Sequence, residues 1–238
     1  MQRDFVLIHG GSHGAWCWEP LIGELAKLGV RGHALDLPGS GEDATPRQAV
    51  TFESCVAAVN DFIASRELDE VTLVGHSIAG GIVPDIVAAS EARVGGVVFL
   101  AAYVLDAGER GIDLIPPERR AAFYEMAAAS PDGSFFLPYE VARAHFFNDL
   151  SEAKARAYFD KLTPQPLAPL LGSATVAART YASMSRYLVC RDDCHLPREL
   201  SSSLAAKLGV APEEVAGGHD CMLAHPRELA RLLTVRAA

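Results

Sequence analysis

The chain reads Gly75-His76-Ser77-Ile78-Ala79-Gly80 between an apolar run at 71–74 and a helical pattern at 82–89. A strand, a tight turn that carries a serine, and a helix form a nucleophile elbow, which exposes the serine hydroxyl. Only small residues fit two places before and after that serine, and Gly75 and Ala79 occupy those positions. We therefore predict Ser77 as a nucleophile at the carboxyl end of a sheet, where such folds bind ligands. The alternative is an ordinary glycine-serine turn at the start of a helix.

The segments on either side alternate between strand and helix patterns. Short apolar runs predict strands at 5–8, 30–37, 94–104, 187–190 and 214–216. Apolar residues at helical spacing predict helices at 18–28, 52–63, 82–89, 197–208 and 226–235, with Thr51 as the N-cap of the second. This alternation indicates an α/β fold with a mostly parallel sheet flanked by helices.

The alternation stops between residues 105 and 185. This stretch is rich in proline and aromatic residues and carries helical patterns at 117–129, 139–147 and 151–162. An insertion of this length between two core strands usually serves a purpose, such as a lid. We therefore expect an α/β core at 1–104 and 186–238, and a mainly helical cap at 105–185 before the penultimate strand.

Composition excludes several classes of protein. Half of the 238 residues are apolar, the net charge is −9, and no cluster of Lys and Arg predicts nucleic-acid binding. No apolar stretch approaches the roughly 20 residues of a membrane span, and residues 1–4 carry no secretory signal. The odd count of five cysteines is typical of a reduced, cytoplasmic protein. Cys190 and Cys194-His195 lack zinc-site spacing, so we expect neither metal nor cofactor. A homodimer is left open.

A serine nucleophile needs a base and an acid, which follow it in the order acid, then histidine, in this kind of fold. His219 lies in a glycine loop, Gly217-Gly218-His219, between the last predicted strand and helix, where the base is expected. Asp192 and Asp193 both follow the strand at 187–190, where the acid is expected. We prefer Asp193 because the acid often precedes an aliphatic-proline pair, here Leu196-Pro197, but position alone leaves Asp192 open.

The oxyanion formed on attack needs two backbone donors, each typically worth about 3–4 kcal/mol. The residue after the nucleophile, Ile78, supplies one amide. The loop after the first strand supplies the other, and we choose Gly11 because the backbone must turn inward there. The alternative is that these glycines only form the turn, and the two interpretations are compatible. The expected substrate pocket takes in four further residues, Gly10, Ser12, Trp16 and Tyr103.

Several motifs together resemble a known family. The opening His9-Gly10-Gly11-Ser12-His13-Gly14-Ala15-Trp16-Cys17-Trp18 is similar to the signature HG-x-x-HG-x-W-x-W. The serine elbow and the closing run from His219 to Pro226 also look like the α/β-hydrolase branch that contains plant methyl esterases, hydroxynitrile lyases and bacterial esterase-like relatives. The resemblance covers nearly the whole chain. It implies Asp193 as the acid and Gly11 as the second oxyanion amide.

The same resemblance separates two activities. Hydroxynitrile lyases of this branch carry Thr and Lys where this chain has Gly10 and Asp220. The resemblance thus implies a serine hydrolase that cleaves a small, hydrophobic or aromatic carboxylic ester through an acyl-enzyme, with Ser77, His219 and Asp193 as its triad. A lyase on the same scaffold, and a ligand-binding protein with a vestigial triad, remain the alternatives.

Overall fold

The computed structural model describes residues 4–235 and contains a parallel sheet at its centre. Its six strands lie in the order β2-β1-β3-β4-β7-β8, and each pair of neighbours is parallel. The predicted parallel sheet is therefore confirmed. The strands are β1 Asp4–Ile8, β2 Arg31–Leu35, β3 Glu70–His76, β4 Arg93–Leu100, β7 Ser185–Cys190 and β8 Pro212–Val215.

Helices cover both faces of the sheet, because the side chains of each strand alternate between two apolar clusters. Phe5 and Leu7 of β1 belong to one cluster, while Val6 and Ile8 belong to the other. The first cluster includes α1 Glu19–Lys27 and α10 Pro226–Thr234, with the short α9 Cys221–Ala224 beside them. The second includes α2 Phe52–Ser65, α3 Val83–Ala89 and α8 Arg198–Leu208.

The boundaries of these helices follow from local sequence. The predicted N-cap Thr51 accepts a hydrogen bond from the Ser54 amide, and the Ser54 hydroxyl accepts one from the Thr51 amide. This reciprocal pair is a capping box, which satisfies two of the amides that a helix start leaves free. Helix α8 ends at Gly209, whose φ of 90° is left-handed and suits a residue without a Cβ.

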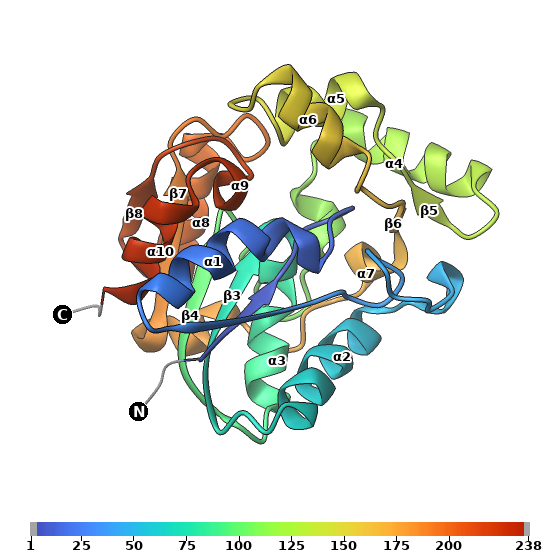
Figure 1. Cartoon of the computed structure of the whole chain (residues 1–238). Helices are drawn as coiled ribbons and strands as arrows, with labels where there is room; N and C mark the ends of the chain where they lie inside the picture. The colour runs from blue at the N-terminus through green and yellow to red at the C-terminus, as the bar shows by residue number, and fades with distance from the viewer. Residues whose placement is uncertain (1–3, 236–238) are drawn as a thin grey trace.

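Much of the segment between β4 and β7, including α4, α5 and α6, lies over the carboxyl end of the sheet, at the top of the view in Figure 1. The first apolar cluster of the core extends into this segment, because Phe123, Phe135 and Phe147 are buried in the same cluster as the residues of α1. The elements of the segment are η4 Gly111–Leu114, α4 Pro117–Ala129, β5 Ser134–Phe135, α5 Tyr139–His145, α6 Glu152–Phe159, β6 Gln165–Pro166, α7 Ala168–Leu171 and η5 Ala178–Met184. Three further short 3-10 helices are η1 Ala15–Trp18, η2 Arg47–Ala49 and η3 Ser77–Gly81.

Two expectations about the elements need correction. The strand expected at 94–104 ends at Leu100, because Ala101 takes a left-handed φ of 42° that breaks the extended backbone. The small antiparallel pair β5–β6 was not expected, since two-residue strands leave no periodic pattern. The residues 1–3 and 236–238 of the expected core lie outside the described part of the chain. None of the helices within 4–235 is both long and apolar enough to cross a bilayer.

Candidate active site

Ser77 lies at the turn between β3 and α3, at the start of η3. Its φ of 56° is left-handed, which is unusual for a residue with a side chain and marks a strained turn. The surrounding glycines allow this turn: a Cβ on Gly75 would come within 2.6 Å of Val83, and one on Gly80 within 2.7 Å of Ala102. The local geometry is that of the elbow predicted from the sequence.

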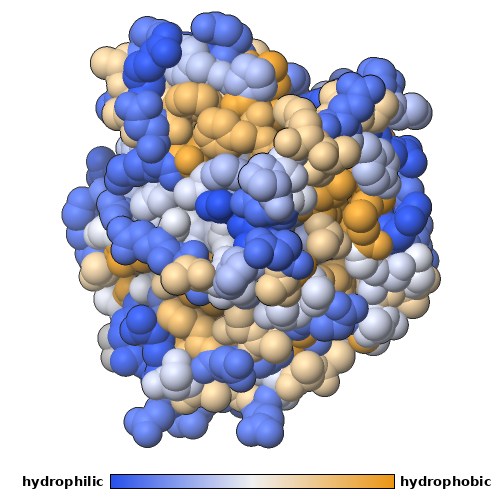
Figure 2. Space-filling view, turned by 90° about the vertical axis from the view of Figure 1, so that its right-hand side faces the viewer, coloured by the Kyte–Doolittle hydropathy of each residue, from blue (hydrophilic) through white to orange (hydrophobic). Residues whose placement is uncertain are grey.

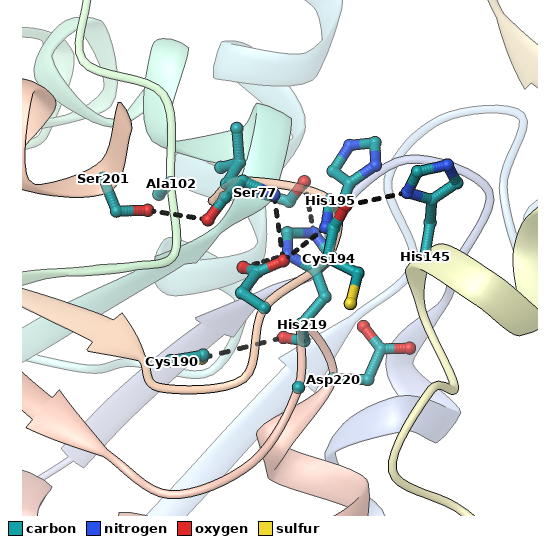
Figure 3. A network of polar contacts seen from close by, with 12 residues as sticks. Ser77, Ala102, His145, Cys190, Cys194, His195, Ser201, His219 and Asp220 are labelled. Atoms are coloured by element: carbon teal, nitrogen blue, oxygen red, sulfur yellow. Dashed lines mark hydrogen bonds and ion pairs between the residues drawn. The ribbon is translucent and has the colours of Figure 1, made fainter. Parts of the chain in front are cut away.

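The structure brings Ser77, His219 and Asp193 together from three separate loops. The Oγ of Ser77 lies 2.9 Å from Nε2 of His219, and Nδ1 of His219 lies 2.8 Å from Oδ2 of Asp193. Figure 3 shows His219 beside Ser77 at the centre of this network. With Nδ1–H donating to the carboxylate, Nε2 is free to accept the hydroxyl proton, which is the arrangement a general base requires.

The structure distinguishes the two candidate carboxylates. Asp193 is buried, and its second oxygen accepts hydrogen bonds from the amides of His195 at 2.7 Å and Leu196 at 2.9 Å. Asp192 is exposed, and its backbone carbonyl accepts a hydrogen bond from Asn148. Only Asp193 contacts His219, and its two backbone donors hold the carboxylate in a fixed orientation.

Gly11 and Ile78 lie against each other beside Ser77. A Cβ on Gly11 would come within 3.1 Å of the Ile78 side chain, and one on Gly10 within 2.8 Å of Cβ of Ser77. The amides of Gly11 and Ile78 make no hydrogen bond within residues 4–235, so both donors are available. The next amide, of Ser12, donates to Oε1 of Gln165 at 2.8 Å, which holds the loop in place.

A cavity of about 260 Å³ opens beside these groups. Its walls are predominantly apolar, as in most small-molecule sites. Ser77, Gly11 and Ile78 lie in its wall, together with the expected pocket residues Ser12 and Tyr103. Gly10 lies instead in the wall of a smaller adjoining cavity, of about 40 Å³. The other residues of the main cavity are Leu114, Ile115, Pro116, Arg119, Phe123, Phe135, Leu137, Phe146, Gln165, Leu170, Cys194, His195, Leu196, Pro197 and Leu200.

Trp16, which we expected in the pocket, is not part of either cavity wall. Its ring is stacked between His13 and Tyr158, with ring centroids 5.4 Å and 5.7 Å away, and Lys161 approaches its face at 5.5 Å. Trp16 belongs to η1, and its ring therefore packs against Tyr158 of α6. Trp16 thus lies outside the cavity wall that contains Ser77.

Sequence reasoning missed a second buried pair behind the site. Nε2 of His13 lies 2.8 Å from Oδ2 of Asp220, and Nδ1 of His13 lies 2.7 Å from the Gly11 carbonyl. Burial opposes a charge on His13, but Asp220 outweighs it and raises the pKa of His13. Burial likewise opposes charge on Asp220, and His13 outweighs it and lowers the pKa of Asp220. The pair joins the Gly11 loop to the residue after His219.

His76, His219 and Asp220 form a buried group that offers ligand atoms within 4.8 Å of one another. Such a group could hold a cation by distance alone. However, both ring nitrogens of His219 already face Ser77 and Asp193. A cation there would displace these contacts, so the donor set does not suit a resident metal of the site. Burial, with charge on His219, also lowers the pKa of His76 well below its usual value.

Comparison with known proteins agrees with this geometry. Residues 5–232 match the model of the alpha/beta hydrolase family. The chain is 30% identical to the carbendazim hydrolyzing esterase of a Nocardioides species, over 98% of both chains. It is 27% identical to methylesterase 7 of Arabidopsis thaliana, over 98% of this chain and 95% of the relative. Five chloroplastic methylesterases of the same plant also match, and the chain spans 55–71% of their length.

Among solved structures, an extracellular alpha/beta-hydrolase from a Paenibacillus species superposes with a TM-score of 0.87. It is 27% identical over 97% of both chains, and it is described as sharing structural and functional homology with tobacco salicylic acid binding protein 2. The fold and the site thus define an alpha/beta hydrolase. This chain belongs to the alpha/beta hydrolase family, as its opening and closing motifs predicted.

Proposed function

We propose that the protein hydrolyses a small carboxylic ester through an acyl-enzyme formed on Ser77. The observation that carries this proposal is the line of contacts from Ser77 through His219 to Asp193, at 2.9 and 2.8 Å, beside two unpaired backbone amides. The esterase and methylesterase relatives bear out the predicted class of carboxylic ester hydrolase. The particular ester is not fixed by them.

Each step of the reaction has a residue assigned to it in this proposal. The Ser77 oxygen attacks the ester carbonyl while His219 takes the hydroxyl proton and Asp193 stabilises the imidazolium. The amides of Gly11 and Ile78 hold the oxyanion of the tetrahedral intermediate. His219 then gives its proton to the leaving alcohol, and a water molecule, deprotonated by His219, releases the acid from Ser77.

The inserted segment at 105–185 serves as a cap in this proposal. It contributes much of the wall opposite the elbow, including Phe123, Phe135 and Leu137. Its side chains give the cavity its apolar character, which supports a hydrophobic or aromatic substrate. The cytoplasmic location and the oligomeric state stay predictions.

The position of Asp220 does not favour the lyase alternative. Asp220, at the position of the lyase Lys, is buried against His13 and is absent from the wall of the main cavity. Asp220 therefore supplies no positive charge for a departing anion at the position of the lyase Lys.

The test is hydrolysis of a graded series of acyl and aryl esters by the parent protein and by Ser77→Ala. We expect turnover of at least one series by the parent, and a loss of at least about 10⁴-fold in the variant, with unchanged circular dichroism. Equal turnover by both proteins would refute the serine mechanism. Cyanohydrin cleavage without ester hydrolysis would favour the lyase. Tight ligand binding, unaffected by the substitution and without turnover, would favour a binding protein.

A further inference from the structure

One side chain in the wall of the main cavity carries a formal charge at neutral pH. Arg119 lies in a predominantly apolar wall that contains no Asp or Glu. His195 is also part of this wall, but burial, together with the charges of His219 and Arg119, lowers the pKa of His195 well below its usual value, so its ring is neutral. The cavity beside Ser77 therefore contains a single fixed positive charge.

Arg119 has no acidic partner among the described residues. Its neighbours Arg110 and Arg120 both pair with Asp113, at 2.8 and 3.2 Å, whereas Arg119 forms no ion pair within residues 4–235. Its guanidinium donates from Nη2 to Nδ1 of His195 at 3.3 Å. A guanidinium has five N–H donors arranged to bind a carboxylate at two points, and this contact uses one of them.

The position of Arg119 in the fold also favours an anion beside it. It lies in the first turn of α4, where the helix dipole favours negative charge and disfavours a cation. A half-buried cation beside apolar walls is unfavourable unless an anion accompanies it. Both the helix end and the guanidinium would therefore be stabilised by an anionic group in the cavity.

The guanidinium of Arg119 is one ring removed from the base, because His195 contacts both Arg119 and His219. The His195 ring lies between Arg119 and the base, with its centroid 4.6 Å from that of His219. Figure 3 shows His195 directly beside His219. An anion on Arg119 would be separated from the ester carbonyl at Ser77 by a short spacer, and Phe123 and Leu196 in the same wall would contact that spacer.

We propose that Arg119 binds an anionic group of the substrate, so that the preferred ester is a small apolar one that carries a carboxylate beyond a short spacer. This inference rests on the proposed ester hydrolysis and names its substrate class. Arg119 acts here as a specificity-determining residue.

Tyr103, also in the wall, is close enough for the charge of Arg119 to act on it, although burial dominates and raises the pKa of Tyr103 to about 12. Its neutral hydroxyl is available as a second donor.

The test compares two 4-nitrophenyl esters of similar size, the neutral butyrate and the anionic hemisuccinate. We expect the parent protein to have the higher kcat/KM for the hemisuccinate. In Arg119→Met, the ratio of the anionic to the neutral kcat/KM should fall by about 10- to 100-fold, the range for a lost hydrogen-bonded contact to a charged group. Arg119→Lys should restore part of the ratio. Arg120→Met, which removes the neighbouring charge on α4, is the matched control and should leave the ratio unchanged.

A second pair, phenyl butyrate and 4-carboxyphenyl butyrate, places the carboxylate on the alcohol side. A preference for the anion in either pair that depends on Arg119 supports the proposal. An unchanged ratio in both pairs for Arg119→Met overturns it, while Ser77-dependent hydrolysis of the neutral esters leaves the proposed function intact.

Calorimetric titration of glutarate into Ser77→Ala and into Ser77→Ala with Arg119→Met tests the anion site without turnover. We expect binding to weaken by about 10-fold or more in the double variant. Equal binding by the two proteins, or no binding by either, overturns the anion site, whether or not any ester is hydrolysed.

Discussion

Asp192 and Asp193 are neighbours in sequence but differ in every contact that matters for catalysis. Asp193 contacts His219 and accepts two backbone amides, whereas Asp192 is exposed to solvent. We expect Asp193→Asn to lower kcat by about 10⁴-fold, because the amide would favour the wrong tautomer of His219. Asp192→Asn is the matched control and should stay within about threefold of the parent, as surface substitutions usually do. Steady-state kinetics with one ester measures both. A large loss of kcat in Asp192→Asn with a small loss in Asp193→Asn would assign the role of the acid to Asp192 instead.

Single residues also show where sequence reasoning reaches its limit. Ser77 and Ile78 could be predicted from local sequence because strand, turn and helix specify the elbow within about ten residues, and Gly11 from its place in the loop after the first strand. His13 and Asp220 could not be paired in this way, since 207 positions separate them and their two motifs do not show that the side chains meet. Arg119 was missed for a related reason: an Arg in the first turn of a helix has no distinctive pattern, and its cavity is formed only by the fold.

At the scale of the elements, the elbow depends on close contact between η3 and the backbone after β4. Gly80 lies against the backbone of Tyr103, whereas a Cβ on Gly23, in the exposed part of α1, would have nothing within 4 Å. We expect Gly80→Ala to destabilise the protein by roughly 1–3 kcal/mol through overpacking. Gly23→Ala should stabilise it by about 0.5–1 kcal/mol, because Ala is the better helix former. Urea unfolding measures both values. Stabilisation by Gly80→Ala would contradict the close approach.

The His13–Asp220 pair ties the loop after β1 to the turn before α9, and its contribution to stability depends on pH. The pKa of His13 is raised, so its contribution is fully present below its ordinary value of about 6.5 and is lost as pH rises through the raised value. The pKa of Asp220 is lowered, so its contribution is present above its ordinary value of about 3.8 and is lost as pH falls through the lowered value. The pair should therefore stabilise most between these limits.

We expect Asp220→Asn to lower the free energy of unfolding by roughly 3–5 kcal/mol near pH 6, the usual cost of breaking a buried pair. The loss should shrink as pH rises well above 6.5, because His13 becomes neutral in the parent as well. Urea unfolding between pH 5 and 9 measures the difference. The exposed Asp61→Asn is the control and should show no such dependence. A difference that grows with pH would contradict the pair.

At the scale of the whole molecule, the cavity lies between the sheet and the segment at 105–185. Figure 2 shows the side of the molecule where part of this segment lies, with hydrophobic surface in its upper part and hydrophilic side chains around it. Phe123 and Phe135 form a stacked pair in the cavity wall, with ring centroids 4.2 Å apart. If the segment acts as a cap, these rings limit the size of the substrate.

We expect Phe123→Leu to raise the preference for a hexanoate over an acetate ester by roughly 10-fold, about the discrimination of one methylene group in an apolar pocket. The half-exposed Phe136, in the same segment but outside the cavity wall, provides the control Phe136→Leu, which should leave the preference unchanged. The ratio of kcat/KM values for the two esters measures it. An identical shift in both variants would show that the segment does not shape the pocket.

The repetitive parts of the overall architecture could be predicted from the sequence. Alternating apolar runs and helical patterns predicted the parallel sheet, and Thr51 caps the start of α2 as expected. The internal structure of the inserted segment was harder to predict from the sequence. Its two-residue strands β5 and β6 depend on pairing across about 30 residues, which no local periodicity records.

The central claim is that the Ser77 hydroxyl is the nucleophile and is activated by His219. The most direct measurement is peptide mass spectrometry after treatment with a fluorophosphonate, which reacts covalently with activated serines. We expect one label per chain, on the peptide that contains Ser77, no label in Ser77→Ala, and greatly slowed labelling in His219→Ala. A label on another residue, or undiminished labelling of Ser77→Ala, would contradict the account.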